Sequence, residues 1–428
     1  MARVKATTSA GTGAARTAQF HLLAKPSGPA CNLDCDYCFY LEKEALYERP
    51  AKRRMAPEVL DAYVRNVLAS TPPEATPLFA WQGGEPTLQG LPFFREAVRL
   101  QKLYAAGRPV TNTLQTNGVL IDEDWARFLA EERFLVGLSL DGPGEVHDRY
   151  RRYRSGAPSH HLVMAALERL QRHGVDYNVL TCVDRHSARQ PQAIYDFLKA
   201  AGVEFIQFTP VVERVAGRDY AAQGFDLAGP GASPAHGKSP QVAPFAVLPE
   251  AWGDFLVGVF NRWRKADIGR VFVMNIEWAL ASYMGQPGAV CLHQKQCGHA
   301  LASEYNGDVY SCDHYVYPDY RLGNLAEDSI ADMVLSPRQQ AFGEAKWRDL
   351  PGKCRSCAQL TLCWGGCPKH RFTRTRDGEA GLNYLCRGYE RYFRHITPWL
   401  SVIAQRVMAG QPLEPVMAMS PAQVRAQA

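Results

Sequence analysis

The chain has 428 residues, of which 46% are hydrophobic and 21% are charged, and its formal net charge at pH 7 is +5. A chain of this length is too long for a single small hydrophobic core and indicates a large globular domain with appended segments. The charge is too small to indicate a nucleic-acid partner, and the absence of any run of about 20 apolar residues argues against a membrane span.

The N-terminal stretch and the cysteine content both bear on location. Residues 1–17 are rich in small residues and lack the apolar segment of a signal peptide, so we expect a disordered tail and a cytoplasmic protein. In a reducing compartment, clustered cysteines bind metal or do redox work more often than they form disulfides. Of the twelve cysteines, Cys182 alone stands apart, in a predicted strand where we expect a small buried apolar residue.

Between residues 19 and 209, apolar runs that predict strands alternate with segments of helical periodicity. Such alternation is typical of a parallel sheet with crossover helices, and it fits both an open doubly wound sheet and a partial barrel. The predicted strands cover residues 19–25, 78–82, 110–115, 135–140, 175–183 and 205–209, and the predicted helices cover 55–70, 92–103, 122–131, 161–173 and 191–201.

The second half of the chain lacks this alternation. Residues 216–248 are rich in Pro, Gly, Ala and Ser and predict a flexible insertion. Residues 249–289 predict a helical linker, with helices over 249–265 and 275–284. The remaining expectations are a cysteine-rich domain over 290–388 with a hairpin around Asn306-Gly307, a helix over 389–410 and a mobile tail over 411–428.

The densest cysteine group is Cys31, Cys35 and Cys38, at CxxxCxxC spacing directly after the first predicted strand. Three thiolates on one loop suit a four-iron cluster with one iron left free of protein ligands, and an open iron can bind a small chelating ligand. A closed zinc site needs four ligands. A partial zinc site and scattered core cysteines are the alternatives.

A second field of cysteines lies between residues 291 and 386. Its eight thiols are enough for two fully ligated four-iron clusters. Two zinc sites of four cysteines each are the alternative, because CxxC pairs often bind zinc. Spacing alone does not say which thiols belong together. The eight residues are Cys291, Cys297, Cys312, Cys354, Cys357, Cys363, Cys367 and Cys386.

The triplet resembles the cluster loop of the radical S-adenosylmethionine (SAM) enzymes, and the second field resembles their SPASM domain. The match extends to the anaerobic sulfatase-maturating enzymes and runs from about residue 19 to 405, departing from them in the long 216–248 insertion. The motifs that carry it are FHLLAKPSGPACNLDCDYCFYLEKEALY at 20–47, WQGGEPTL at 81–88, QTNG at 115–118, SLDGPGEVH at 139–147 and CDHY at 312–315.

This resemblance implies a fold and a set of cofactors. The expected fold is α/β, with a partial (β/α)6 radical SAM barrel over 18–215 and SAM across the C-terminal strand ends, where such barrels place their chemistry. A SPASM domain and a C-terminal helix follow. The resemblance implies SAM and three 4Fe-4S clusters, one of them held by Cys31, Cys35 and Cys38. One auxiliary cluster is assigned to Cys291, Cys297, Cys312 and Cys367, and the other to Cys354, Cys357, Cys363 and Cys386.

The resemblance also implies individual site residues. Asp313, directly after Cys312, matches the catalytic base, and an ordinary turn aspartate is the alternative. For Arg151 and Ile206 the alternatives are a solvated basic face and a core position. The implied SAM contacts are Tyr37 and Ile206 at the adenine, Gly83 and Gly84 at the amino group, Ser139 at the ribose or carboxylate, and Arg151 at the carboxylate.

The implied reaction is oxidation of a Cys or Ser in a sulfatase C/S-x-P/A-x-R motif to formylglycine. An electron donor such as flavodoxin or ferredoxin is expected, and no nucleic acid or membrane. One alternative is another SPASM peptide maturase that forms a thioether or carbon–carbon crosslink; Asp313 and the shortness of residues 1–17 argue against it. A second is a non-catalytic iron–sulfur carrier, which would not need an open iron.

Overall fold

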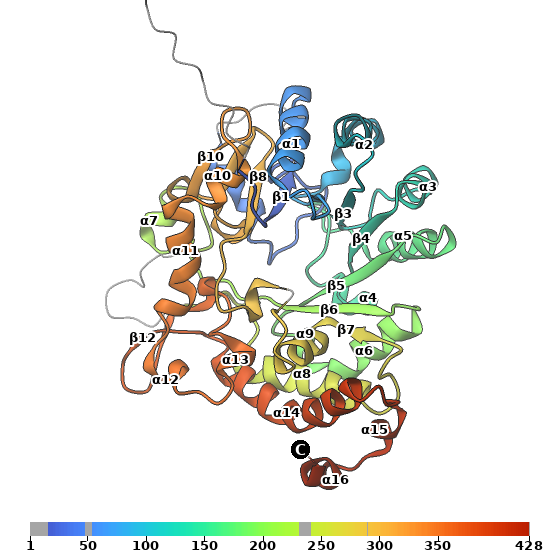
Figure 1. Ribbon diagram of the computed structural model, residues 1–428, viewed down its shortest axis with the longest axis vertical. Coiled ribbons are helices and arrows are strands. Elements are labelled where there is room, and N and C mark those ends of the chain that lie inside the picture. The colour runs from blue at the N-terminus through green and yellow to red at the C-terminus, as the bar shows by residue number, and fades with distance from the viewer. Residues whose placement is uncertain (1–15, 48–53, 231–240, 289, 428) are drawn as a thin grey trace, which may run out of the picture.

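A ten-stranded sheet runs through the molecule in the order β10-β9-β8-β1-β2-β3-β4-β5-β6-β7. The computed structural model describes residues 16–47, 54–230, 241–288 and 290–427 (Figure 1). Most of the predicted N-terminal tail therefore lies outside the described residues.

The six predicted strands lie side by side in this sheet and pair in parallel, as the alternation predicts. Figure 1 shows them in an arc with helices on the outer side. The strands are β1 His21–Lys25, β2 Leu78–Trp81, β3 Thr111–Thr116, β4 Phe134–Ser139, β5 Tyr177–Val183 and β6 Phe205–Pro210. The intervening helices are α1 Pro57–Ser70, α2 Leu91–Ala105, α3 Glu123–Glu131, α4 Gly144–His147, α5 His160–Arg172 and α6 Pro191–Ala200.

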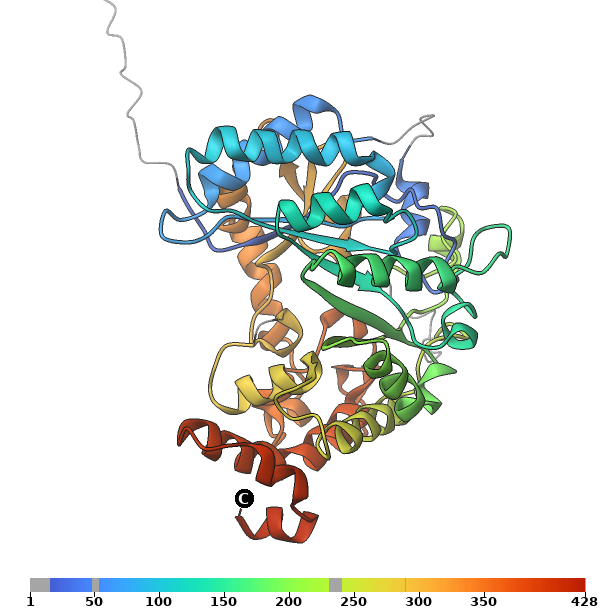
Figure 2. The same cartoon turned by 90° about the vertical axis from the view of Figure 1, so that its right-hand side faces the viewer.

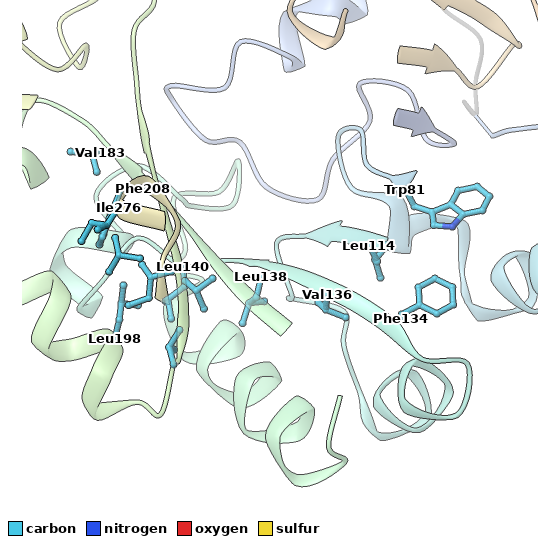
Figure 3. Close-up of a cluster of buried hydrophobic side chains, with 14 of the residues drawn as sticks. Trp81, Leu114, Phe134, Val136, Leu138, Leu140, Val183, Leu198, Phe208 and Ile276 are labelled. Atoms are coloured by element: carbon cyan, nitrogen blue, oxygen red, sulfur yellow. The ribbon is translucent and has the colours of Figure 1, made fainter. Parts of the chain in front are cut away.

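Apolar side chains between the strands and these helices form the core (Figure 3). Trp81, Leu114 and Phe134 are each at most 1% exposed. The ring of Trp81 meets that of Phe94 edge-on at 5.5 Å, an arrangement that aromatic pairs prefer. A capping side chain fixes the start of α3: the Asp122 carboxylate accepts a hydrogen bond from the Trp125 N–H at 2.9 Å.

The cysteine-rich half adds strands to the same sheet, which the sequence does not predict. β8 (Ala300–Glu304) pairs in parallel with β1, from His21 opposite Ala300 to Lys25 opposite Glu304. β8 and β9 (Asp308–Tyr310) form the predicted hairpin around Asn306-Gly307, and β10 (Arg321–Asn324) completes this edge. The pairing sets Glu304, the last residue of β8, beside Lys25 at the end of β1.

The remaining elements are short apart from three helices. α8 (Pro249–Trp263) and α9 (Met274–Tyr283) match the predicted helical linker, with the unpredicted β7 (Phe272–Val273) between them. α11 (Pro337–Arg348) was not predicted either. The others are α7 Arg218–Ala221, α10 Ile330–Val334, α12 Gly352–Arg355, α13 Leu360–Cys363, β11 Thr373–Arg374 and β12 Ala380–Leu382.

The C-terminal helix α14 (Cys386–Met408) packs along α8 (Figure 2). After it, the predicted mobile tail folds back as α15 (Glu414–Ala418) and α16 (Pro421–Gln427). Val416 and Val424 are buried, so apolar burial holds this segment in place. Pro and Ala content alone did not reveal these two anchors.

The predicted insertion is also partly ordered by burial. Residues 231–240 lie outside the described part. In the flanking segments Phe225 and Val247 are buried, and Val215 bridges to Leu227. None of the helices in the described part of the chain combines the length and apolar character that a membrane crossing requires.

Candidate active site

The cysteine loop leaves the C-terminal end of β1 and packs against the turn that follows β2. The Gly84 N–H donates to Gly28 O at 2.8 Å, and the Glu85 N–H donates to Ala30 O at 2.9 Å. A Cβ on Gly84 would lie 2.1 Å from Ala30 O. Gly84 is thus required by the approach of two protein backbones. Its predicted SAM contact, like that of Gly83, stays a prediction.

The structure brings the three thiols of this loop together. Burial raises the pKa of Cys35, the Arg151 guanidinium lowers it, and the Cys38 and Cys31 thiols raise it. Burial also raises the pKa of Cys38 to about 11. The Leu33 N–H lies 3.4 Å from Cys31 Sγ and can donate to a thiolate there. Such thiols stay protonated until a metal replaces the proton, so the loop fits a metal-bound cluster.

At the end of β4, a carboxylate organises the predicted SAM contacts. Asp141 accepts a hydrogen bond from Arg151 Nε at 2.8 Å and another from the Tyr37 hydroxyl. Arg151 is 7% exposed, which excludes the solvated basic face. Burial lowers the pKa of Arg151, but Asp141 and Tyr37 raise it more, so the guanidinium is held as a cation.

Cys182 lies beside Asp141 and Arg151 and is not the small buried apolar residue predicted. It is partly exposed, its Sγ is 3.6 Å from Arg151 Nη2, and its N–H donates to Asp141 Oδ1 at 2.9 Å. The prediction was wrong because Cys182 lies near the C-terminal end of β5, and polar groups gather at these ends of the parallel strands.

The two other predicted SAM contacts differ in what they expose. Ser139 is 8% exposed, and its hydroxyl accepts a hydrogen bond from Gln115 Nε2 at 3.1 Å. Ile206 is 0% exposed in the core of the sheet. It therefore offers adenine no exposed surface in this structure, as the core alternative predicts.

Asp313 lies beside the end of β1, where the cysteine loop begins. Its Oδ1 is 2.5 Å from Nζ of Lys25, which is 1% exposed and 3.8 Å from the centre of the Tyr40 ring. Burial raises the pKa of Asp313, but Lys25 and His314 lower it more, so the pKa falls below its ordinary value. The carboxyl is thus ionised, which is the form that accepts a proton, while its role as the catalytic base stays a prediction.

Two sets of four thiols lie in the cysteine-rich half. Burial raises the pKa of Cys312, and the Cys367 and Cys291 thiols raise it further. Burial also raises the pKa of Cys297, again together with Cys291 and Cys367. Cys367 thus lies with Cys291, Cys297 and Cys312, which is the crossing that the resemblance implied.

The second set is brought together in the same way. Burial raises the pKa of Cys363, and the Cys386, Cys354 and Cys357 thiols raise it further. All four thiols line one cavity of about 250 Å³, with Tyr389 among its other walls. A cavity walled by four thiols fits a metal cluster. This fit is to a cluster of several irons and not to a single ion, since within the described ranges no three or more His, Cys, Asp or Glu side chains are placed to hold one metal ion.

Comparisons with known proteins decide the family. Residues 26–198 match the radical SAM superfamily and residues 297–358 match the SPASM iron–sulfur cluster-binding domain. A serine-type anaerobic sulfatase-maturating enzyme of Bacteroides thetaiotaomicron is 43% identical over 91% of this chain and 92% of its own length. A cysteine-type enzyme of Clostridium perfringens is 31% identical over 90% of this chain and 98% of its own.

This chain belongs to the anaerobic sulfatase-maturating enzyme family. Native anSMEcpe, solved with bound AdoMet and Cp18Cys peptide, aligns with a TM-score of 0.77 at 30% identity, covering 90% of this chain and 99% of that one. Streptococcus suis SuiB, solved with its precursor peptide SuiA, shares the fold alone, with a TM-score of 0.57 at 14% identity over 87% of this chain and 77% of that one. Membership confirms the predicted fold and the expected cofactor classes, SAM and 4Fe-4S clusters.

Two basic side chains near the first auxiliary thiol set were missed by sequence reasoning. Lys346 is 1% exposed and its Nζ donates to Cys291 O at 2.6 Å. Arg371 is half-buried among backbone carbonyls, with Nη2 2.7 Å from Trp364 O. Buried cations beside thiolates favour the charged form of the sulfur. Neither residue has a motif of its own, so only the structure could find them.

Further side chains connect the first thiol loop to the first auxiliary set. His314 Nδ1 lies 3.7 Å from Cys367 Sγ, and its ring meets that of Phe39 at 5.0 Å. Lys369 Nζ lies 4.2 Å from the centre of the Phe39 ring and pairs with Glu213. Asp141 was also missed, although an acidic residue directly after a parallel strand is a readable signal.

Proposed function

We propose that this protein oxidises one Cys or Ser of a sulfatase C/S-x-P/A-x-R motif to formylglycine. The relatives named above support the substrate class, since this chain matches a serine-type enzyme over 92% of that enzyme's length and a cysteine-type enzyme over 98%. The observation that carries the proposal is the position of Asp313, whose Oδ1 lies 2.5 Å from Lys25 Nζ at the end of β1. The base and the cysteine loop therefore meet at one edge of the sheet.

Each part of the reaction then has residues of this chain. We assign Cys31, Cys35 and Cys38 to the catalytic cluster, and Tyr37, Gly83, Gly84, Ser139 and Arg151 to SAM. A cluster and SAM held by these residues would supply the radical chemistry that removes a hydrogen atom from the substrate Cβ. The protein's part is to hold that carbon in line and to keep water away.

Asp313 is proposed as the base. Loss of a hydrogen atom and a second electron from Cβ makes the substrate thiol or hydroxyl acidic, and its proton goes to the carboxylate within hydrogen-bond reach. For Ser the product is the aldehyde itself; for Cys it is a thioaldehyde, which water then hydrolyses to the aldehyde with loss of hydrogen sulfide. Lys25 keeps Asp313 ionised and fixed in place before the substrate arrives. We assign electron acceptance to the thiol set of Cys291, Cys297, Cys312 and Cys367, because Cys312 precedes the base directly.

We place the protein in the cytoplasm with flavodoxin or ferredoxin as its electron donor. None of the twelve cysteines is in a disulfide, which suits a reducing compartment.

The test is anaerobic. The protein is reconstituted with iron and sulfide, reduced, and given SAM with two short peptides that carry C-x-P-x-R or S-x-P-x-R. Mass spectrometry is expected to find the mass change from thiol or alcohol to aldehyde in at least one peptide. SAM cleavage with both peptides unchanged would overturn the proposal.

A further inference from the structure

A basic groove lies on the outer face of the C-terminal helices. It has a volume of about 700 Å³ and runs between α8, α14 and α16. Arg387, Arg391 and Arg394 follow one another at helical spacing on α14, and Arg264 and Arg425 add two more guanidinium groups. Among the described residues that line the groove, Glu390 is the single carboxylate.

The three arginines of α14 remain available to a partner. Their side chains are 79%, 55% and 74% exposed, and they pair with Glu250, Asp254 and Glu390 respectively. Exposed ion pairs of this kind contribute little and exchange readily, because water screens them. Each guanidinium also has five N–H donors, more than one carboxylate can use.

The base of the groove holds a cation that the protein does not neutralise. The Arg264 guanidinium lies 4.1 Å from the centre of the Trp399 ring, and its buried Nε has no hydrogen-bond partner. Burial lowers the pKa of Arg264, and no described carboxylate offsets that. An acidic group arriving from outside would satisfy this donor.

The groove borders the second auxiliary thiol set. Cys386 is the first residue of α14, so a cluster thiol and the arginine row share one helix. Glu390 and Arg394 line both the groove and the cavity walled by the four thiols. A protein seated on the arginines would therefore lie beside the cavity that Cys354, Cys357, Cys363 and Cys386 line.

We propose that this arginine face is the docking surface for an acidic one-electron carrier protein bearing a flavin or iron–sulfur group. The inference rests on the proposed function, in which hydrogen abstraction removes one electron from the substrate and a second electron must leave. The oxidised carrier takes up that electron and becomes reduced by one. Charge complementarity speeds such encounters and makes them depend on salt, which suits brief redox contacts over a small area.

The experiment measures association of a purified acidic flavodoxin with the reconstituted enzyme by surface plasmon resonance at low and high ionic strength. The test variant is Arg387→Glu/Arg391→Glu/Arg394→Glu. The matched control is Arg65→Glu/Arg99→Glu/Arg127→Glu, which makes the same charge change at arginines that are 60%, 59% and 58% exposed and paired with carboxylates on α1, α2 and α3.

We expect the α14 variant to associate about 10- to 1000-fold more slowly at low salt and to lose its salt dependence. The control should associate like the wild type. Equal association rates for the two variants would overturn the proposal. So would loss of inorganic pyrophosphate binding in the α14 variant without loss of flavodoxin binding, since the groove would then be a small-anion site.

This outcome is separate from that of the proposed function. Formylglycine formation by the wild type is measured with dithionite as reductant, without any carrier. Its failure would remove the reaction assigned above, whereas a failure of docking would leave peptide oxidation by the wild type intact.

Discussion

Residues 78–140 and residues 335–384 lie in one molecule and are held together in different ways. The first segment buries apolar side chains throughout, and Glu85 is its one buried carboxylate. In the second, which is fully described, the buried hydrophobic residues are Leu350, Cys354 and Leu362 alone. Its buried side chains are instead mostly polar, among them Lys346 and His370. Metal binding supplies folding energy where a core cannot, so we expect the second segment to depend on its clusters.

Removing the first thiol loop should end the chemistry and leave the apolar segment folded. In Cys31→Ala/Cys35→Ala/Cys38→Ala we expect no SAM cleavage, because nothing holds the cluster that reduces SAM. SAM cleavage is followed by chromatography of 5′-deoxyadenosine, and the fold by circular dichroism. Residual cleavage would show that these thiols are not the cluster ligands.

Removing the proposed base should reduce formylglycine formation strongly but leave SAM cleavage intact. In Asp313→Asn we expect SAM cleavage to continue while formylglycine falls by about 10²- to 10⁴-fold, the usual contribution of a positioned base. Mass spectrometry of the peptide measures this fall. The control is Asp319→Asn, an exposed carboxylate six residues along the same region. Full peptide oxidation by Asp313→Asn would exclude it as the essential base.

The stability of residues 78–140 should depend on apolar packing and not on the clusters. Phe134→Ala removes a ring that is 1% exposed, and such losses cost about 3–5 kcal/mol. Denaturant unfolding should show this loss with or without iron. A loss that appears only in the iron-free protein would contradict an apolar origin.

The cysteine-rich segment should respond to cluster loss locally. In Cys354→Ser/Cys363→Ser we expect faster amide hydrogen exchange over 350–386 and unchanged exchange over 78–140, since few apolar contacts remain to hold the first stretch. Mass spectrometry of exchanged peptides measures both. Equal exchange of both stretches in variant and wild type would remove the contrast drawn above.

The smallest expected effect concerns pH. Burial raises the pKa of Glu304 to about 8, although Lys25 lowers it. The folded protein therefore holds a proton that the unfolded chain has lost between about pH 4.5 and 8, so this group's contribution to stability falls as pH rises, by at most about 1.4 kcal/mol per unit. Glu304→Gln has no titrating group at this position. Its melting temperature minus that of the wild type should therefore increase from pH 5.5 to 7.5. A constant difference would place the Glu304 pKa outside this range.

The sequence predicted the parallel strands well because each leaves a local apolar run, as Leu78–Trp81 and Phe134–Ser139 do. It missed the pairing of β8 with β1, since His21 and Ala300 are too far apart for any periodicity to connect them. The assignment of Cys367 to the first auxiliary set came from family resemblance, since spacing left it open. Lys25, Lys346 and Asp141 act through contacts that only the folded chain makes.

The pairing of β1 with β8 has a consequence for synthesis. A chain released from the ribosome up to residue 215 would have every parallel strand of the alternating half, yet one edge of β1 would remain open until residues 300–304 emerged. Open strand edges template aggregation, and contacts between distant residues form slowly. Translation delivers roughly 5–20 residues per second. The nascent chain therefore passes several seconds with this edge unprotected, and fragments that stop before β8 should need a chaperone to stay dispersed.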